Sequence, residues 1–114
     1  MTDLNYFVLL VFGPLLILVG ILGFVIPQNK SLTSGAPAYN IFHLFFGLIG
    51  VVIVYLNHDP CIRAFNIGFG VMDIYQAAAS FAHIFPEKHF RWTRVDDVLH
   101  VVIGAALVIV GVFG

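Results

Sequence analysis

The chain has few of the residues that cover the surface of a soluble domain. Only 10% of its 114 residues are charged, and its formal net charge at pH 7 is −1. Soluble domains carry about 25% charged residues, so this chain lacks the material for an ordinary charged surface. The near-neutral balance also excludes the basic patch with which proteins bind nucleic acid.

Cysteine and catalytic groupings are scarce as well. Cys61 is the only cysteine, so neither an intramolecular disulfide nor two-thiol redox chemistry is available to the chain. The histidines do not follow the H-x-x-E-H or Cys-His spacings that bind metal ions, and no nucleophile is accompanied by a base and an orienting residue. The sequence therefore supports no metal site and no enzyme class.

Most of the chain is apolar: 61% of its residues are hydrophobic, and its mean hydropathy is +1.02. Crossing a bilayer takes about 20 mostly apolar residues in a helix. Four segments meet or approach that length: Asn5 to Ile26, Pro37 to Leu56, Ile62 to Phe85 and Arg94 to Phe113. The sequence predicts an all-α, polytopic membrane protein, with one domain over residues 1–114 and four transmembrane helices in two tandem hairpins.

The few cations predict how these spans are oriented. Lys30, Lys88, Arg91 and Arg94 fall in the loops on one side, whereas Arg63 alone falls on the other. Cytoplasmic loops carry an excess of Lys and Arg, so we expect the first side to be cytoplasmic and both termini non-cytoplasmic. The first seven residues hold no Lys or Arg, unlike a signal peptide, and we expect the first span to be retained.

Two similar motifs indicate an internal repeat. Residues 40–47 read NIFHLFFG and residues 97–104 read DVLHVVIG, so a polar residue, a histidine and a glycine recur at the same spacing half a chain length later. Other residues recur at the same offset: Phe12 with Phe69 and Gly13 with Gly70. A repeat of residues 1–57 in residues 58–114 places two hairpins around a pseudo-two-fold axis along the membrane normal.

Helix-start signals place the motif histidines inside the membrane. Pro37 suits the first position of a helix, and Thr93 with Asp96 three residues later resembles a capping box with Asp in place of Glu. Both signals lie before the Asn-x-x-His and Asp-x-x-His patterns, which argues against reading those patterns as helix caps. His43 and His100 then lie roughly 9 Å below the helix starts, at equal depth.

A polar stripe on the third span completes a predicted buried network. Its residues follow spacings of 7, 3, 4 and 3 from Asn66 to His83, which places them on one helix face. Ionisable groups inside a bilayer are costly unless they face the bundle interior and find partners. We therefore predict that one inward network joins His43 and His100 to Asn40, Asp73, Gln76, Ser80, His83 and Asp97.

Three functions are consistent with this network. The first is a structural, accessory or assembly role in a membrane complex, with lipid, other membrane subunits or a second copy of the chain as partners. The second is bis-histidine binding of haem b by His43 and His100, with a glycine one turn further along each helix leaving room for the macrocycle, or of a pigment by one histidine. The third is small-molecule transport coupled to protons at Asp73.

At these residues the chain resembles a family of small four-span membrane proteins of bacteria and cyanobacteria that is known as a domain of unknown function. The resemblance covers the glycine-rich first span ending near Pro27, the motif at 40–47 and the fourth span. Asp97 stands where the family usually has Asn, and Asp73 and Gln76 lie outside its pattern. The resemblance implies a four-span fold in a bacterial inner membrane, or in a thylakoid membrane of a cyanobacterium, and no particular biochemistry.

Overall fold

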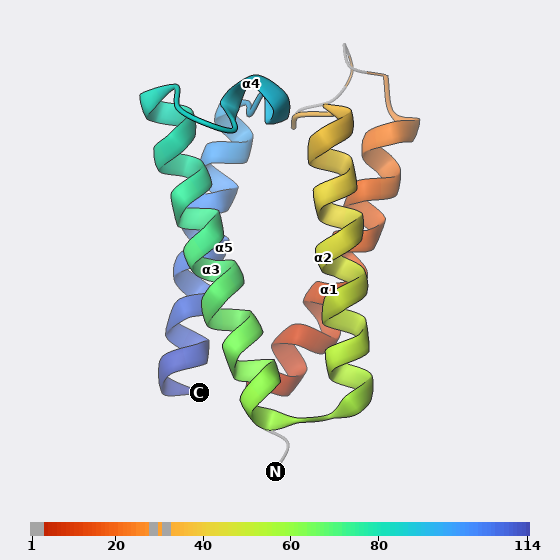
Figure 1. Ribbon diagram of the computed structural model, residues 1–114, viewed down its shortest axis with the longest axis vertical. Coiled ribbons are helices and arrows are strands. Elements are labelled where there is room, and N and C mark those ends of the chain that lie inside the picture. The colour runs from red at the N-terminus through yellow and green to blue at the C-terminus, as the bar shows by residue number, and fades with distance from the viewer. Residues whose placement is uncertain (1–3, 28–29, 31–32) are drawn as a thin grey trace.

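A computed structural model describes residues 4–27, 30 and 33–114 (Figure 1). Four long antiparallel helices stand side by side, and a one-turn helix lies across one end between the last two of them. No strand occurs in the described ranges. The helices are α1 (Leu4–Val25), α2 (Pro37–Leu56), α3 (Asp59–Ala82), α4 (Glu87–Phe90) and α5 (Arg94–Phe113).

The predicted helix limits are confirmed where local sequence signals define them. Both ends of α2 and α5 agree with the prediction, and α1 is shifted by one residue. Helix α3 starts three residues early, at Asp59, because Pro60 favours the first turn of a helix. It also ends three residues early, because His83 adopts a left-handed conformation with φ 58°. The short helix α4 was not predicted.

The bundle is apolar outside and polar inside. Phe81, Val11 and Val102 are 90%, 67% and 61% exposed, whereas Asn66 and Asp73 are 0% and 3% exposed. A soluble protein would show the reverse arrangement, and a membrane protein requires this one. Helices α1, α2 and α5 are each long and apolar enough to cross a membrane, in agreement with the predicted all-helical membrane protein.

Glycines allow the helices of each hairpin to approach closely. Helix α1 packs on α2, and α3 packs on α5. A Cβ atom added to Gly47 would lie 2.9 Å from the carbonyl oxygen of Gly13, and one added to Gly104 would lie 2.8 Å from that of Gly70. Backbone therefore faces backbone at one level of each hairpin, as in membrane helix pairs that associate through small residues.

One contact between the two hairpins lies near the middle of the bundle. Leu16, Phe69 and Leu107 form a buried cluster there, and the rings of Phe12 and Phe69 are 5.4 Å apart in an edge-to-face contact. Closer to the chain termini, the side-chain amide of Asn66 donates to the side-chain and backbone oxygens of Asn5. Figure 1 shows α1 approaching α3 toward this end, so the two hairpins are in contact there as well.

Candidate functional site

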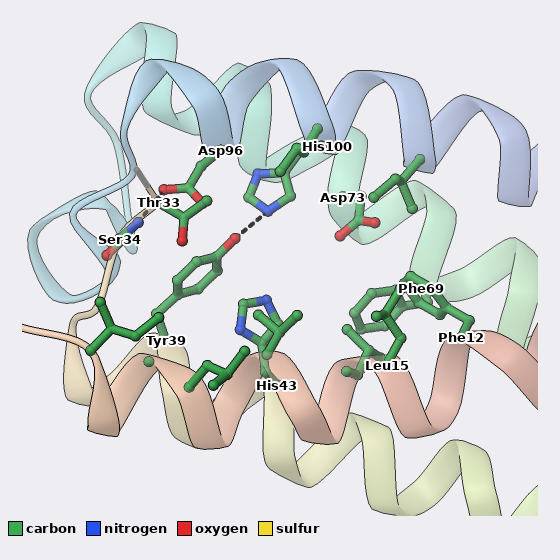
Figure 2. Close-up of a pocket in the computed structure, with 17 residues that line it drawn as sticks. Phe12, Leu15, Thr33, Ser34, Tyr39, His43, Phe69, Asp73, Asp96 and His100 are labelled. Carbon is green, nitrogen blue, oxygen red and sulfur yellow. Dashed lines mark hydrogen bonds between the residues drawn. The ribbon is translucent and has the colours of Figure 1, made fainter. Parts of the chain in front are cut away.

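A cavity of about 240 Å³ lies between the hairpins. It extends from the contact between Phe12 and Phe69 toward the α4 end. Its walls come from α1, α2, α3, α5 and the segment that precedes α2 (Figure 2). Helix α1 contributes only apolar side chains and Gly23 to the lining. The polar lining residues come from the other elements: Thr33, Ser34, Tyr39, His43, Asp73, Asp96 and His100. The cavity is thus apolar on one side and polar on the other.

Tyr39 connects the two hairpins at the polar side of the cavity. Its hydroxyl forms a hydrogen bond of 2.5 Å with Nε2 of His100, between α2 and α5. Its ring lies against the His43 imidazole, with 4.2 Å between the ring centroids. Tyr39 is 2% exposed. Figure 2 shows the Tyr39 hydroxyl, both imidazoles and the Asp73 carboxylate around the same space.

Asp96 anchors the segment that precedes α2. The predicted capping box is confirmed, because the Thr93 hydroxyl accepts from the Asp96 backbone N–H and the Asp96 carboxylate accepts from the Thr93 N–H. The same carboxylate oxygen also accepts from the Ser34 N–H at 2.7 Å. The Ser34 hydroxyl donates to the Phe90 carbonyl and accepts from the Ala36 N–H. These bonds hold the first hairpin against the second at the α4 end.

Asp73 presents a carboxylate to the cavity from the middle of α3. It is 3% exposed, and its Oδ1 is 3.4 Å from the Gln76 side-chain nitrogen, a long hydrogen bond. The other end of the Gln76 amide accepts from the Trp92 indole N–H at 3.0 Å. A carboxylate has about four acceptor sites, so Asp73 retains capacity to bind a further donor.

Both motif histidines carry a buried nitrogen that the described residues leave without a hydrogen-bond partner. The atoms are Nδ1 of His43 and Nδ1 of His100, and the two side chains are 8% and 5% exposed. Buried polar groups in proteins are nearly always hydrogen-bonded. Both imidazoles line the cavity, so a molecule bound there would contact the two rings.

The structure brings part of the predicted network together. His43, His100 and Asp73 meet at the cavity, and Gln76 joins them through Asp73. Asn40 is buried but is not among the residues that line the cavity: its side chain donates to the Gly35 carbonyl at 2.9 Å and lies against Gly23 of α1.

Three further network residues lie away from the cavity. Ser80 is buried in α3, and Asp97 is partly buried, with a buried Oδ1 that has no partner among the described residues. The prediction that His83 belongs to the buried network is wrong, since His83 is exposed. The reason is its left-handed conformation, which ends α3, so the helical periodicity that predicted a buried face no longer applies there.

Sequence reasoning missed Tyr39, Asp96 and Ser34. Tyr39 counts as hydrophobic in a sequence pattern, and Asp96 was interpreted only as a helix cap. The repeat could have found both, because Tyr39 and Asp96 occupy equivalent positions in the two halves of the chain and each immediately precedes a motif. No comparable pattern marks Ser34, because its role depends on how a connecting segment meets the second hairpin.

The cavity does not fit a haem. Nε2 of His100 is engaged by Tyr39, and about 240 Å³ is below the roughly 300–1,000 Å³ of pockets for drug-sized ligands. No Lys or Arg occurs among the described lining residues to pair with propionates. The glycines expected to admit the macrocycle, Gly47 and Gly104, instead contact the backbone of the neighbouring helix.

Neither a metal-binding group among the described residues nor a similar known protein indicates the function. Within the described part of the chain, no three His, Cys, Asp or Glu residues are grouped so that they could hold a metal ion. Comparison of the chain with protein-family models, curated proteins and solved structures finds no match. The functional assignment therefore depends on the geometry of the cavity.

Proposed function

We propose that this protein is a four-span membrane protein, built from two repeated hairpins, that binds a small amphipathic molecule from the lipid phase. The observation that carries the proposal is the cavity between the hairpins, with apolar side chains on one side and Tyr39, His43, Asp73 and His100 on the other. Such a surface matches a molecule with a hydrocarbon part and a compact polar part.

The fourth span in this proposal is α3. Its 24 residues extend over roughly 36 Å at 1.5 Å per residue, and it packs along α5, which qualifies as a span. Its polar side chains lower its mean hydropathy but are buried, whereas Val71, Ile74 and Phe81 cover its outer face. Helix α3 is therefore suited to contact lipid on its outside and the cavity on its inside.

Contacts between equivalent positions of the two halves support the repeat. The close approach of Gly13 to Gly47 has its counterpart in the approach of Gly70 to Gly104. Phe12 and Phe69, which also occupy equivalent positions, contact each other where the hairpins meet. Contact between equivalent residues is what a pseudo-two-fold axis between two hairpins requires.

The charge distribution supports an orientation with the cavity nearer the cytoplasm. Four cations lie on the α4 side, in the connection between α1 and α2, in or just after α4, and at the start of α5: Lys30, Lys88, Arg91 and Arg94. At the opposite end Arg63 donates to the carbonyls of Gly111 and Gly114 at 2.6 and 2.9 Å. We place the α4 end in the cytoplasm by the positive-inside rule, with the protein in a bacterial inner membrane.

Ligand binding explains a feature that a purely structural network does not. A structural network would be complete when its members pair with one another, as Tyr39 and His100 do. The cavity beside the two imidazoles and the remaining acceptor capacity of Asp73 instead indicate a site that is completed by another molecule. A role within a larger membrane complex is compatible with such a site and stays a prediction.

Transport is less well supported than binding. A transported molecule needs a path across the membrane, and below the cavity Leu16, Phe69 and Leu107 fill the space between the hairpins. The lining of the cavity ends at Phe12, Phe69 and Ile103, so the cavity does not extend to the end that holds the chain termini. Proton-coupled transport at Asp73 stays a prediction that the described geometry does not favour over binding.

Native mass spectrometry of the protein released from its own membrane in mild detergent tests the proposal. We expect a one-to-one adduct on the wild type and its loss in Val19→Phe, because Val19 lines the cavity and a larger side chain fills it. Leu18→Phe is the matched control, since Leu18 is 49% exposed on the outer face of α1. Equal adducts on both variants, or none on the wild type, would overturn the proposal.

A further inference from the structure

We propose that the bound molecule is a quinone or its hydroquinone, with its ring in the cavity and its hydrocarbon tail in a groove between α1 and α5. This inference rests on the proposed function and specifies the ligand of the same site. Three observations carry it: an apolar groove that shares lining residues with the cavity, polar cavity lining without cations among the described residues, and aromatic walls around the polar groups.

A second, apolar groove adjoins the cavity on the lipid-facing side of α1 and α5. It is lined only by apolar residues of α1 and α5, has a volume of about 400 Å³ and shares Phe12, Leu15 and Ile103 with the cavity. Its outer lining residues Val11 and Val102 are 67% and 61% exposed. From Leu15 to Phe7 the groove follows roughly 12 Å of α1, from the middle of the helix toward the end that holds the chain termini. A hydrocarbon tail fits this surface.

The head of the ligand is uncharged. Among the described residues of the cavity lining no Lys or Arg is present, whereas Asp73 and Asp96 are. A phosphate or carboxylate head would need a cation or several N–H donors to replace its hydration. Ring carbonyl and hydroxyl groups need only neutral hydrogen-bond partners, and His43, His100 and Asp73 supply both donors and acceptors.

The head is also a flat ring of limited size. Phe12, Phe69, Tyr39 and the two motif imidazoles form aromatic walls around the cavity, and aromatic side chains favour stacked or edge-on contact with another ring. A space of about 240 Å³ accommodates one substituted six-membered ring and excludes a macrocycle. The oxygens on opposite sides of such a ring match a lining whose polar groups come from different helices, with Asp73 on α3 and the histidines on α2 and α5.

The single tryptophan provides a reporter for this inference. Trp92 is the only Trp of the chain, and its ring centroid is 6.3 Å from that of His100. A quinone accepts an electron from an excited indole, so its binding beside His100 quenches Trp92 fluorescence. We expect saturable quenching of the full chain in detergent by a decyl-substituted benzoquinone, with affinity about tenfold or more weaker in Val19→Phe and unchanged in Leu18→Phe.

Competition identifies the head group. Three competitors with ten-carbon chains are added in separate titrations against the quenching quinone. They are a decyl-substituted hydroquinone, decanol and decanoate. We expect displacement by the hydroquinone alone. If decanol or decanoate displaces the quinone equally well, the ring head is wrong while amphiphile binding stands. If quenching is linear and equal in Val19→Phe, the quinone merely dissolves in the micelle and the quinone inference is overturned. Absence of a native adduct would overturn the proposed function as well.

A substitution in the groove tests the placement of the tail. Ala106→Phe places a ring in the groove on α5, and we expect it to weaken the decyl-substituted quinone about tenfold, since each buried methylene contributes roughly fourfold to affinity. The affinity of methyl-benzoquinone, which lacks the tail, should not change. Ala78→Phe, on the exposed face of α3, is the control. Equal loss for both quinones would place the tail elsewhere.

Discussion

Individual polar residues of this protein serve either to join the hairpins or to line the cavity, and Tyr39 does both. Its hydroxyl bonds to His100 of the other hairpin, and its ring covers His43. Asp96 also does both, because its carboxylate accepts from Ser34 across the hairpins and lines the cavity. Asn66 belongs to the first kind, since its side-chain amide donates to Asn5 of the other hairpin. Asp73 belongs to the second kind, since its carboxylate faces the cavity.

Removal of the Tyr39 hydroxyl tests the link between the hairpins. We expect Tyr39→Phe to lower the free energy of unfolding by about 1–3 kcal/mol, because a buried hydrogen bond is lost and His100 is left with an unsatisfied nitrogen. The measurement is thermal or denaturant unfolding in a fixed detergent.

Tyr55→Phe is the control for this substitution, because Tyr55 is 87% exposed. Its free energy of unfolding should stay within about 0.5 kcal/mol of the wild type. If Tyr39→Phe and Tyr55→Phe lower the free energy of unfolding equally, the Tyr39–His100 hydrogen bond does not stabilise the contact between the hairpins.

At the scale of the helices, glycine matters where two backbones touch. Gly104 faces the carbonyl of Gly70, and a Cβ atom there would also lie 3.0 Å from the Cβ of Asp73. Backbone cannot move aside as the end of a flexible side chain can. The spacing of α3 and α5 thus determines where Asp73 stands relative to His100.

Gly104→Ala and Gly68→Ala should therefore have opposite effects. We expect Gly104→Ala to destabilise the protein by about 1–3 kcal/mol through overpacking. Gly68 has no atom within 4 Å of an added Cβ, so Gly68→Ala should stabilise α3 by up to about 1 kcal/mol through helix propensity. Unfolding measurements in the same detergent compare them. Loss of stability in both variants would show that the glycine contact is not what separates them.

The sequence predicted the helices better than the site, for a physical reason. Apolar length, Pro37 and the Thr93 capping box are local signals, and they placed both ends of α2 and α5 correctly. The cavity depends on how one hairpin meets the other, which no local pattern encodes. The motif histidines and Asp73 were predicted to face inward because exposing a charge to lipid is costly. The contact of Tyr39 with both histidines depends on tertiary packing. The exposure of His83 depends on where α3 ends.

At the scale of the whole molecule, the polar cavity lies toward the end that carries most of the cations. The opposite end holds Arg63 and the turn around Cys61, which is exposed. The orientation that we propose therefore predicts different chemical access to the two ends in intact cells.

Thiol labelling in intact cells measures this access. Cys61 should react with a membrane-impermeant maleimide added outside, because we place its end in the non-cytoplasmic space. In a Cys61→Ser background, Lys88→Cys on the α4 end should react only after the membrane is opened. The reverse pattern of labelling would invert the orientation and place the cavity near the outer surface.

The central claim is that the cavity between the hairpins binds a molecule from the lipid phase, and the five histidines of the chain allow a direct test. Nuclear magnetic resonance of imidazole-labelled protein in lipid nanodiscs would follow all five during addition of a lipid-soluble extract of the native membrane. We expect the resonances of His43 and His100 to shift and those of the exposed His58, His83 and His89 to stay unchanged. Unchanged resonances at both cavity histidines, or equal shifts at all five, would contradict it.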